Sequence, residues 1–424
     1  APAAPSANPA APAFVMAVDA LSQWDDFAVQ RQAARGWIAT PRIAAPAADP
    51  AKTRLRLGFV ASAFGNHPVP RLLSGLIAAL DRERAQPIAI ATTTQNRRDP
   101  SVDATLARFD AAVEIKQGAL TPEDLRKLQD LDIDVLFDLN GLTGDALPAL
   151  FYQRVAPMHV NYLGFTGTMG SELYDYIVAD SYCIPEASSR EYAEKVLRID
   201  PCYLPSDPTR MIGATGMTRA RYGLPDEAFV MAMFGSTFKL ARGTFAVWMA
   251  TMRAHPRTVM WLRPMHEAAV ANLRRSAETL GVAPHRLVFS VLERTPDYLA
   301  RFRLADLVLD TYPYGSHTTT DLALFAGVPV VTVAGRTFAA RASASQLATM
   351  GLHELIADDL DAYARRCDAL ITDPGRLAAV TGRVRADAAR AALFDMQPYA
   401  RKFVDAIFAG WRALAASRQD SARR

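Results

Sequence analysis

The segment Leu304–Arg341, LADLVLDTYPYGSHTTTDLALFAGVPVVTVAGRTFAAR, decides the fold of this chain. Its apolar run Leu307–Leu309 predicts a buried strand, and a turn rich in proline, glycine and serine follows it. The sequence then predicts a helix that begins at residues 317–321 and a second buried strand at residues 328–333. Strands that alternate with helices in this way are typical of βαβ units in a parallel sheet.

The predicted helix begins with five polar residues, His317, Thr318, Thr319, Thr320 and Asp321. The first N–H groups of a helix have no partner inside it and its dipole is positive at this end, so a helix start binds anions. In a doubly wound sheet, such a helix start lies at the carboxyl ends of the strands, where ligands bind. The same side chains would also serve merely to cap the helix. Three consecutive hydroxyl groups beside a histidine exceed what capping requires, and we therefore predict a phosphate-binding site.

The composition is typical of a globular protein rather than of a nucleic-acid-binding or membrane protein. Hydrophobic residues make up 50% of the 424, and 47 basic side chains nearly balance 44 acidic ones, for a net charge of +3. So balanced a charge argues against nucleic acid or a membrane as a partner. Cys183, Cys202 and Cys367 fit no metal-ligand pattern, and no secretory signal is recognised. We expect a cytoplasmic protein with no metal site and no cofactor.

Composition and periodicity divide the chain into four regions. Residues 1–50 are predicted to be a disordered Ala/Pro leader and a short helix, with helical spacing from Phe14 to Trp37. Residues 51–215 and 216–385 alternate strands and helices and are each predicted to form a doubly wound, Rossmann-like domain. Residues 386–424 are predicted to form a helical tail, with Phe403, Ile407, Phe408 and Trp411 on one face. The expected architecture is α/β of GT-B type, with the ligand in a central cleft between the two domains.

Individual elements of the first domain can also be predicted. Strands are expected at residues 55–61, 86–92, 135–139 and 176–179, and helices are expected from about residue 70 and at residues 121–131.

Two residues are candidates for chemistry because each follows a predicted strand. His67, in a Gly-Asn-His-Pro turn, could accept a proton or orient a substrate hydroxyl, or could only bond the backbone of its turn. Lys239 could neutralise a departing diphosphate, although a surface lysine is the simpler reading of the sequence alone. Polar turns and a glycine-rich loop that allows close approach of a ligand supply further candidates, namely Asn140, Thr143, Gly167 and Thr168.

Six motifs in order along the chain resemble the catalytic half of the O-GlcNAc transferase/SPINDLY family, the family 41 glycosyltransferases. They are LRLGFVASAFGNHP, DVLFDLNGLTG, RVAPMHVNYLGFTGTMGSELYDYIVAD, FGSTFK, LADLVLDTYPYGSHTTT and FAGVPVVTVAGRTFAARASASQL, and the resemblance extends from Arg54 to Trp411. It implies an inverting, metal-independent GT-B enzyme that transfers a sugar from a nucleotide donor, most often UDP-GlcNAc, to a protein serine or threonine. The expected partners are a nucleotide sugar and a protein or peptide acceptor.

The resemblance also implies roles for residues of this sequence. His67 matches the active-site histidine, as a base or as an orienting group, and Lys239 matches the lysine that contacts the diphosphate. The remaining matches are the phosphate site at the helix start (His317, Thr318 and Thr319), an arginine near the nucleotide base (Arg301), and the donor- and acceptor-side loops (Asn140, Thr143, Gly167 and Thr168).

The sequence departs from the family pattern at four points. The family has a ribose-binding carboxylate four residues before the alanine of the Ala326-Gly327 turn, but this position is Leu322 here, and Asp321 lies one residue earlier. One residue corresponds to about 100° of rotation on a helix. The usual Tyr-Pro-Gly-Thr is replaced by Phe165-Thr-Gly-Thr168, and the histidine near the base in the animal enzymes aligns with Tyr298. The 424 residues contain no tetratricopeptide repeat, the element that commonly holds the protein acceptor.

Several other functions are compatible with the sequence. Within the same chemistry, the donor could be GDP-fucose or UDP-glucose, and the acceptor could be a saccharide. A UDP-GlcNAc 2-epimerase shares the GT-B fold but needs no acceptor, so product analysis separates it from a transferase. The shifted Asp321 would also fit a nucleotide-sugar-binding protein with weak or no turnover.

Overall fold

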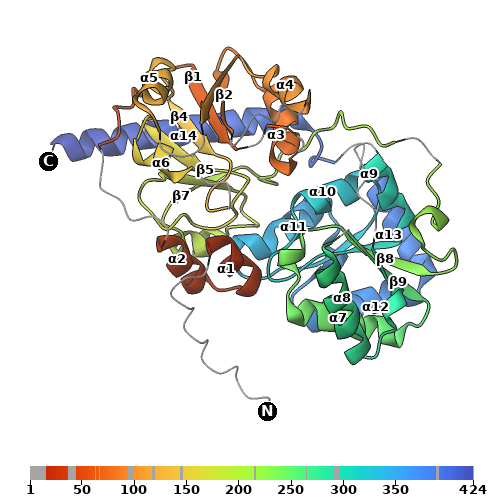
Figure 1. Cartoon of the computed structure of the whole chain (residues 1–424). Coiled ribbons are helices and arrows are strands. Elements are labelled where there is room, and N and C mark those ends of the chain that lie inside the picture. Colours follow the sequence, from red (N-terminus) through yellow and green to blue (C-terminus); the bar gives the residue numbers. More distant parts are fainter. Residues whose placement is uncertain are drawn as a thin grey trace.

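The computed structural model of the chain describes residues 16–36, 44–62, 64–65, 67–93, 100–116, 120–143, 147–213, 216–263, 265–289, 297–387 and 391–423. The predicted leader before residue 16, Trp37, and Asn66 of the first turn lie outside these residues. The described strands form two parallel sheets, each surrounded by helices in its own domain (Figure 1). The two-domain α/β architecture predicted from the sequence is therefore confirmed.

The first domain contains a seven-stranded parallel sheet in the order β3-β2-β1-β4-β5-β6-β7. Its strands are β1 (Leu55–Ala61), β2 (Ala85–Thr93), β3 (Ala111–Lys116), β4 (Val135–Asp138), β5 (Met158–Asn161), β6 (Tyr176–Ala179) and β7 (Lys195–Arg198). Its helices are α3 (Pro68–Ala79), α4 (Pro100–Leu106), α5 (Pro122–Asp130), α6 (Pro148–Tyr152) and the 3₁₀ helix η1 (Glu186–Glu191). The predicted strands and helices of this domain are present; β1 and β6 have the predicted ends, and the ends of the others differ from the predictions by up to two residues.

The second domain contains a six-stranded parallel sheet in the order β10-β9-β8-β11-β12-β13. Its strands are β8 (Phe229–Met233), β9 (Thr258–Leu262), β10 (Leu287–Phe289), β11 (Leu307–Leu309), β12 (Val330–Val333) and β13 (Ile356–Ala357). Its α-helices are α7 (Arg242–Ala254), α8 (Glu267–Thr279), α9 (Asp297–Ala300), α10 (Thr318–Phe325), α11 (Phe338–Thr349), α12 (Leu360–Thr372) and α13 (Pro374–Asp387). Its 3₁₀ helices are η2 (Ala220–Tyr222), η3 (Thr237–Lys239), η4 (Pro284–Arg286), η5 (Arg301–Leu304) and η6 (His353–Leu355).

The apolar runs that decide the fold form central strands. Every residue of β4 and of β11 is buried, because a parallel strand covered by helices on both faces has no solvent side. Helix α10, which follows β11, likewise buries most of its length, including Thr320 and Asp321 near its start. The predicted strand–turn–helix–strand unit at residues 304–333 is therefore confirmed.

The helical spacing from Phe14 to Trp37 corresponds to two helices rather than one. Helices α1 (Ala17–Gln23) and α2 (Phe27–Arg35) are separated at Asp26, whose carboxylate accepts hydrogen bonds from the backbone N–H groups of Ala28 (2.9 Å) and Val29 (3.0 Å). This side chain starts a new helix because it satisfies N–H groups that have no partner inside it. The two helices lie at the boundary between the domains (Figure 1).

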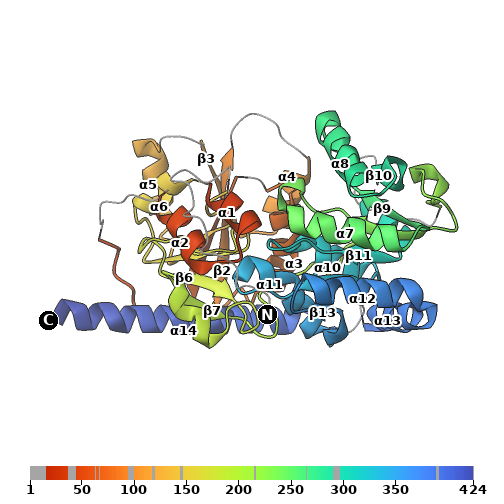
Figure 2. The ribbon, with the colours of Figure 1, turned by 90° about the horizontal axis from the view of Figure 1, so that it is seen from below.

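The long C-terminal helix α14 (Met396–Arg423) returns from the second domain to the first. It lies along the first domain (Figure 2) and contacts α3 and β7. Its predicted apolar face is confirmed, since Phe403, Ile407, Phe408 and Trp411 are all buried.

The division of the chain at residues 215 and 385 stays a prediction. None of the helices in the described ranges combines the length and the apolar character needed to cross a bilayer.

Candidate active site

Several of the predicted site residues lie at the switch point of a sheet, where the strand order reverses. In the first sheet this point is between β1 and β4, and in the second it is between β8 and β11. Ligands of doubly wound proteins bind beside such a point, at the carboxyl ends of the strands. The turns after these four strands contain His67, Asn140 and Thr143, Lys239, and His317. Tertiary structure therefore gathers into two places residues that are far apart in the sequence.

His67 caps helix α3 directly after the turn that follows β1. Its Nδ1 accepts a hydrogen bond from the backbone N–H of Val69 at 3.4 Å, and the side chain is exposed. An imidazole nitrogen that accepts carries no proton, so the neutral ring holds its proton on Nε2 in this arrangement. The alternative that His67 bonds the backbone of its turn is thus realised through Nδ1.

Asn140 connects the ends of β1 and β4. Its Nδ2 donates to the Ser62 hydroxyl at 2.7 Å, and its Oδ1 accepts from the Ser62 N–H at 2.9 Å. Asp138, which the sequence analysis did not select, holds the turn by accepting hydrogen bonds from the N–H groups of Asn140 (2.9 Å) and Gly141 (2.7 Å). Thr143 lies half-buried at the end of the same turn. Asn140 therefore shapes the first switch point, and its side-chain amide is already engaged within the protein.

The loop that contains Gly167 and Thr168 is held from beneath by a buried acid. The Thr168 hydroxyl donates to Glu194 Oε2 at 2.7 Å, and the N–H of Met169 donates to Glu194 Oε1 at 2.6 Å. Burial raises the pKa of Glu194 to about 7. The Gly167 carbonyl accepts a hydrogen bond from Asn161 Nδ2 at 2.9 Å. The Thr168 hydroxyl thus supports the loop from inside, and the place of Gly167 and Thr168 beside a ligand stays a prediction.

Lys239 reaches from the turn after β8 to the turn after β11. Its Nζ donates to the Gly315 carbonyl at 2.9 Å and lies 3.7 Å from the centre of the Tyr314 ring. Burial lowers the pKa of its ammonium to about 8, because the charged form loses hydration. Lys239 is therefore no ordinary surface lysine, and it places a positive charge beside the segment that begins α10.

The turn before α10 is organised by Asp310, a second buried acid that the sequence analysis did not select. It accepts hydrogen bonds from the N–H groups of Thr311 (2.9 Å) and Ser316 (2.6 Å) and from the Thr332 hydroxyl (2.6 Å). Asp138 and Asp310 share a sequence signal, since each is an acid at the end of a buried apolar strand beside a switch point. This signal identifies the residues that hold the turns.

The start of α10 has the character of an anion site. His317 is buried, its Nδ1 lies 3.3 Å from the Tyr203 hydroxyl, and burial together with the Lys239 charge holds its pKa well below the usual value. It is therefore neutral at pH 7. Thr318 and Thr319 are half-buried, and the described residues provide no hydrogen-bond partner for either hydroxyl. The contact of these two residues with a phosphate stays a prediction.

Two further residues of the predicted helix start have side chains that are bonded within the protein. The Thr320 hydroxyl lies 2.8 Å from the Ser343 hydroxyl of α11 and donates to the Ser316 carbonyl at 3.2 Å. Asp321 is fully buried, forms an ion pair with Arg210, and accepts a hydrogen bond from the Ser206 hydroxyl at 2.7 Å. Their contact with a nucleotide sugar stays a prediction, and the rotation of the helix turns both side chains into the protein in this structure.

Arg301 is buried within the second domain. Its guanidinium carbon lies 4.1 Å from the centre of the Phe234 ring and 4.2 Å from that of Tyr298, and the side chain is 1% exposed. This position keeps Arg301 near the first strand of the domain but inside an aromatic cluster. The predicted contact with a nucleotide base stays a prediction.

The helices α1 and α2 join both domains beside these turns, which the sequence analysis did not foresee. The Asp25 carboxylate accepts hydrogen bonds from the N–H groups of Arg336 (2.6 Å) and Thr337 (2.7 Å) in the second domain. On the other side, a Cβ added to Gly167 would lie 3.0 Å from a methyl group of Leu21. Helix α1 also contacts η3, which carries Lys239. The only sequence signal was the polar pair at residues 25–26, and it does not identify a partner.

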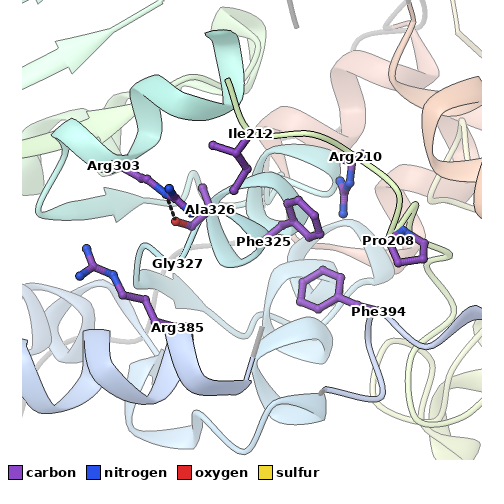
Figure 3. A pocket seen from close by; sticks show the side chains of 9 residues that line it. All are labelled: Pro208, Arg210, Ile212, Arg303, Phe325, Ala326, Gly327, Arg385 and Phe394. Atoms are coloured by element: carbon purple, nitrogen blue, oxygen red, sulfur yellow. Dashed lines mark hydrogen bonds between the residues drawn. The ribbon is translucent and has the colours of Figure 1, made fainter. Parts of the chain in front are cut away.

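The hollow drawn in Figure 3 lies at the other end of α10. It has a volume of about 810 Å³ and is lined by Pro208, Arg210, Ile212, Arg303, Phe325, Ala326, Gly327, Arg385 and Phe394. Lys239 and His317 are not part of it. The described residues contain no group of three or more His, Cys, Asp or Glu side chains that could hold a metal ion.

Comparison with known protein sequences identifies relatives over most of the chain. The profile of Glycosyl transferase family 41 matches residues 40–215 and 208–403. The probable UDP-N-acetylglucosamine--peptide N-acetylglucosaminyltransferase SEC of Arabidopsis thaliana is 28% identical over 86% of this chain and 38% of its own length. The UDP-N-acetylglucosamine--peptide N-acetylglucosaminyltransferase of Caenorhabditis elegans is 23% identical over 85% of this chain and 41% of its own length. The chain thus spans about two fifths of the length of these relatives.

Comparison with solved structures shows the same relationship in three dimensions. A variant of the Thermobaculum terrenum O-GlcNAc transferase superposes with a TM-score of 0.84 at 28% identity, over 94% of this chain and 76% of that one. Anabaena Alr3699/HepE, in complex with UDP and glucose, shares the fold with a TM-score of 0.57 at 13% identity, over 84% of this chain and 100% of that one. The expected GT-B architecture is confirmed by the first of these matches. Because the family profile matches both domains, this chain belongs to glycosyl transferase family 41.

Proposed function

We propose that this chain is the catalytic region of an inverting, metal-independent glycosyltransferase that moves N-acetylglucosamine from UDP-GlcNAc to a serine or threonine hydroxyl of a protein. The observation that carries this proposal is the position of the Lys239 ammonium, 2.9 Å from the Gly315 carbonyl in the turn that leads into α10. The relatives described above are named UDP-N-acetylglucosamine--peptide N-acetylglucosaminyltransferases, which supports this donor and a peptide acceptor.

The second domain supplies positive potential where the leaving group would develop charge. A nucleoside diphosphate gains negative charge as the bond to the sugar breaks, and fixed donors aimed at that charge stabilise the transition state. We assign this task to the Lys239 ammonium and to the first N–H groups of α10, with the Thr318 and Thr319 hydroxyls as additional donors. Because an ammonium and a helix dipole both supply positive charge, the proposed site needs no metal ion for this step.

The acceptor hydroxyl would attack the anomeric carbon from the face opposite the diphosphate, which inverts the configuration. His67 is the candidate that would contact this hydroxyl from the first domain. We propose that His67 acts on this hydroxyl, either by orienting it or by taking the proton that it loses as the bond to the sugar forms and the bond to the diphosphate breaks.

A different donor is the main alternative, and one observation favours testing it. The Asp321 carboxylate is already bound by Arg210 and Ser206. We therefore propose that Asp321 does not bind the ribose, so that other residues must determine selectivity for UDP. GDP-fucose and UDP-glucose thus stay alternatives, as does binding of a nucleotide sugar with weak or no turnover. Calorimetric titration with UDP and with GDP separates the first two possibilities, because tight binding of only one nucleotide fixes the donor class.

Transfer itself is tested by incubating the protein with UDP-GlcNAc, GDP-fucose or UDP-glucose and a mixture of serine- and threonine-containing peptides. We expect nucleoside diphosphate release together with a peptide mass increase of one N-acetylhexosamine, and about 10²-fold slower formation of both products by Lys239→Ala. Lys195→Ala, which removes an exposed lysine of β7, serves as the matched control and should retain both products. Tight nucleotide binding without transfer to any peptide or saccharide would instead identify a binding protein.

A further inference from the structure

The segment between the two sheets carries a buried, charged junction formed by Ser206, Arg210 and Asp321. Asp321, in α10, is fully buried and is bound by Arg210 Nη1 through a short hydrogen bond and by the Ser206 hydroxyl at 2.7 Å. Arg210 Nη2 also donates to the Ser206 hydroxyl at 2.5 Å. The three side chains thus form a closed triangle in which each contacts the other two. We refer to them as the interdomain junction.

On the side of the first domain, Ser206 packs against helices α3 and α14. A Cβ added to Gly75 of α3 would lie 2.1 Å from the Ser206 carbonyl oxygen, so the helix and this segment are in direct backbone contact. The Ser206 N–H donates to the sulfur of Met396, at the start of α14, at 3.2 Å. Helix α3 is the one that His67 caps. The position of Ser206 is therefore fixed relative to the helix that carries the candidate acceptor-binding histidine.

On the second-domain side, Arg210 holds α10 at two places. Its Nη1 binds Asp321 in the first turn of the helix, and its guanidinium carbon lies 4.3 Å from the centre of the Phe325 ring in the last turn. A planar guanidinium that bonds through one edge and stacks through one face has little freedom to rotate. The junction thereby fixes α10 in orientation as well as in position. The start of α10 is the proposed diphosphate site.

We propose that the interdomain junction is a positioning device, which sets the start of α3 against the start of α10 and so places the acceptor group of one domain over the leaving-group site of the other. This inference rests on the proposed function. A buried ion pair is often no more stabilising than a well-packed apolar pair, but it specifies one geometry. Transfer needs such a geometry, because a misplacement of about 1 Å can lower a rate about 10²-fold. The role of Asp321 is thus to orient two domains and not to bind ribose.

The hollow beside the junction makes a direct test feasible. Arg210 is one of its lining residues, and Figure 3 shows this side chain beside Phe325 at the edge of the hollow. Arg210→Ala would open a space of guanidinium shape next to a hollow of about 810 Å³. Ethylguanidinium chloride, at tens of millimolar, supplies the planar guanidinium group that the variant lacks. Ethylammonium chloride at the same concentration matches its charge and ionic strength but has no guanidinium group.

We expect Arg210→Ala to lower kcat about tenfold or more while the dissociation constant for UDP stays within about threefold of the wild-type value, because the diphosphate site itself is intact. Ethylguanidinium should restore a large part of kcat, and ethylammonium should not. Arg303→Ala is the matched control, since Arg303 lines the same hollow and bonds the Ala326 carbonyl rather than Asp321. It should behave as the wild type with and without either salt.

Three results would overturn the proposal: an unchanged kcat in folded Arg210→Ala, a loss of UDP affinity as large as the loss of kcat, or equal rescue by both salts. The first would mean that the junction only stabilises the fold, and the second that it belongs to the donor site. If Arg210→Ala does not fold, Arg210→Lys can be used for the same test, because it keeps the positive charge and loses the planar guanidinium group. The split between kcat and UDP affinity should then persist at a smaller size.

A readout without turnover separates this inference from the proposed function. Amide hydrogen exchange in residues 70–79 and 203–210 should be about tenfold faster in Arg210→Ala and should return towards the wild-type rate in ethylguanidinium. That result would support the junction even if the wild-type protein transferred no sugar. Unchanged exchange would exclude an orienting role for the junction even if transfer were observed.

Discussion

The pH dependence of transfer tests the assignment of Lys239 most directly. Burial lowers the pKa of its ammonium from 10.5 to about 8, since the charged form loses hydration in this site. A group with a pKa of about 8 is about 91% protonated at pH 7 and about 9% protonated at pH 9, so kcat/KM, which reports the free enzyme, should fall about tenfold over this interval. The sign follows from the proposed role, because only the protonated amine can neutralise a diphosphate.

The assay is nucleoside diphosphate release at donor concentrations well below KM, in buffers of constant ionic strength. Lys239→Arg keeps its positive charge throughout this pH range, so its profile should be flat between pH 7 and pH 9 whatever its absolute rate. Lys239→Ala should lose about 10²-fold in rate at every pH and show no inflection. A flat wild-type profile, or the same decline in Lys239→Arg, would show that Lys239 is not the titrating group.

Three further predictions concern stability, measured as the free energy of unfolding in urea. Burial raises the pKa of Glu194 from 4.5 to about 7, so between these pH values the folded state keeps a proton that the unfolded state releases. The free energy of unfolding should therefore fall by about 3 kcal/mol as the pH rises from about 4.5 to about 7. Glu194→Gln should remove that slope, and an identical slope in the variant would contradict this explanation. Asp25→Ala should lower the free energy of unfolding by about 2 kcal/mol, because it removes the acceptor for two backbone N–H groups of the second domain. Asp26→Ala removes only a helix cap and should cost about 1 kcal/mol. Equal costs of the two substitutions would count against a domain-joining role of Asp25. Gly75→Ala should lower the free energy of unfolding by about 1–3 kcal/mol, because its Cβ would lie 2.1 Å from the Ser206 carbonyl oxygen. Gly382→Ala, in the open part of α13, should instead stabilise the protein by about 0.5–1 kcal/mol. A Gly75→Ala variant as stable as the wild type would refute the close contact.

Much of the candidate site could be predicted because local sequence encodes where strands end. The apolar runs at 135–138 and 307–309 form central strands, and the polar residues directly after them lie at the two switch points. Resemblance to a family added Lys239, for which the residues alone favoured a surface position. Its contact with the Gly315 carbonyl joins residues 76 positions apart, which no local pattern could indicate.

The predictions at the start of α10 depend on directions that local sequence does not give. A run of hydroxyl and acidic side chains at a helix start indicates that donors and acceptors are present, but successive residues point in directions about 100° apart. Thr318 and Thr319 remain without a partner among the described residues, whereas Thr320 turns into the core and contacts Ser343. The sequence could not say which of the four positions faces a ligand, because that depends on what packs around the helix.

The sequence by itself determined two doubly wound domains and the turns that carry His67, Lys239 and His317, because the periodicity of apolar residues and the chemistry of turns act over a few neighbouring residues. Only the tertiary structure decided what Asp321 does. Its partner Arg210 lies 111 residues away on the segment between the sheets, and a carboxylate that folds into a buried site takes whichever cation the fold brings to it. The same reason explains Asp25, whose partners are backbone N–H groups of the opposite domain.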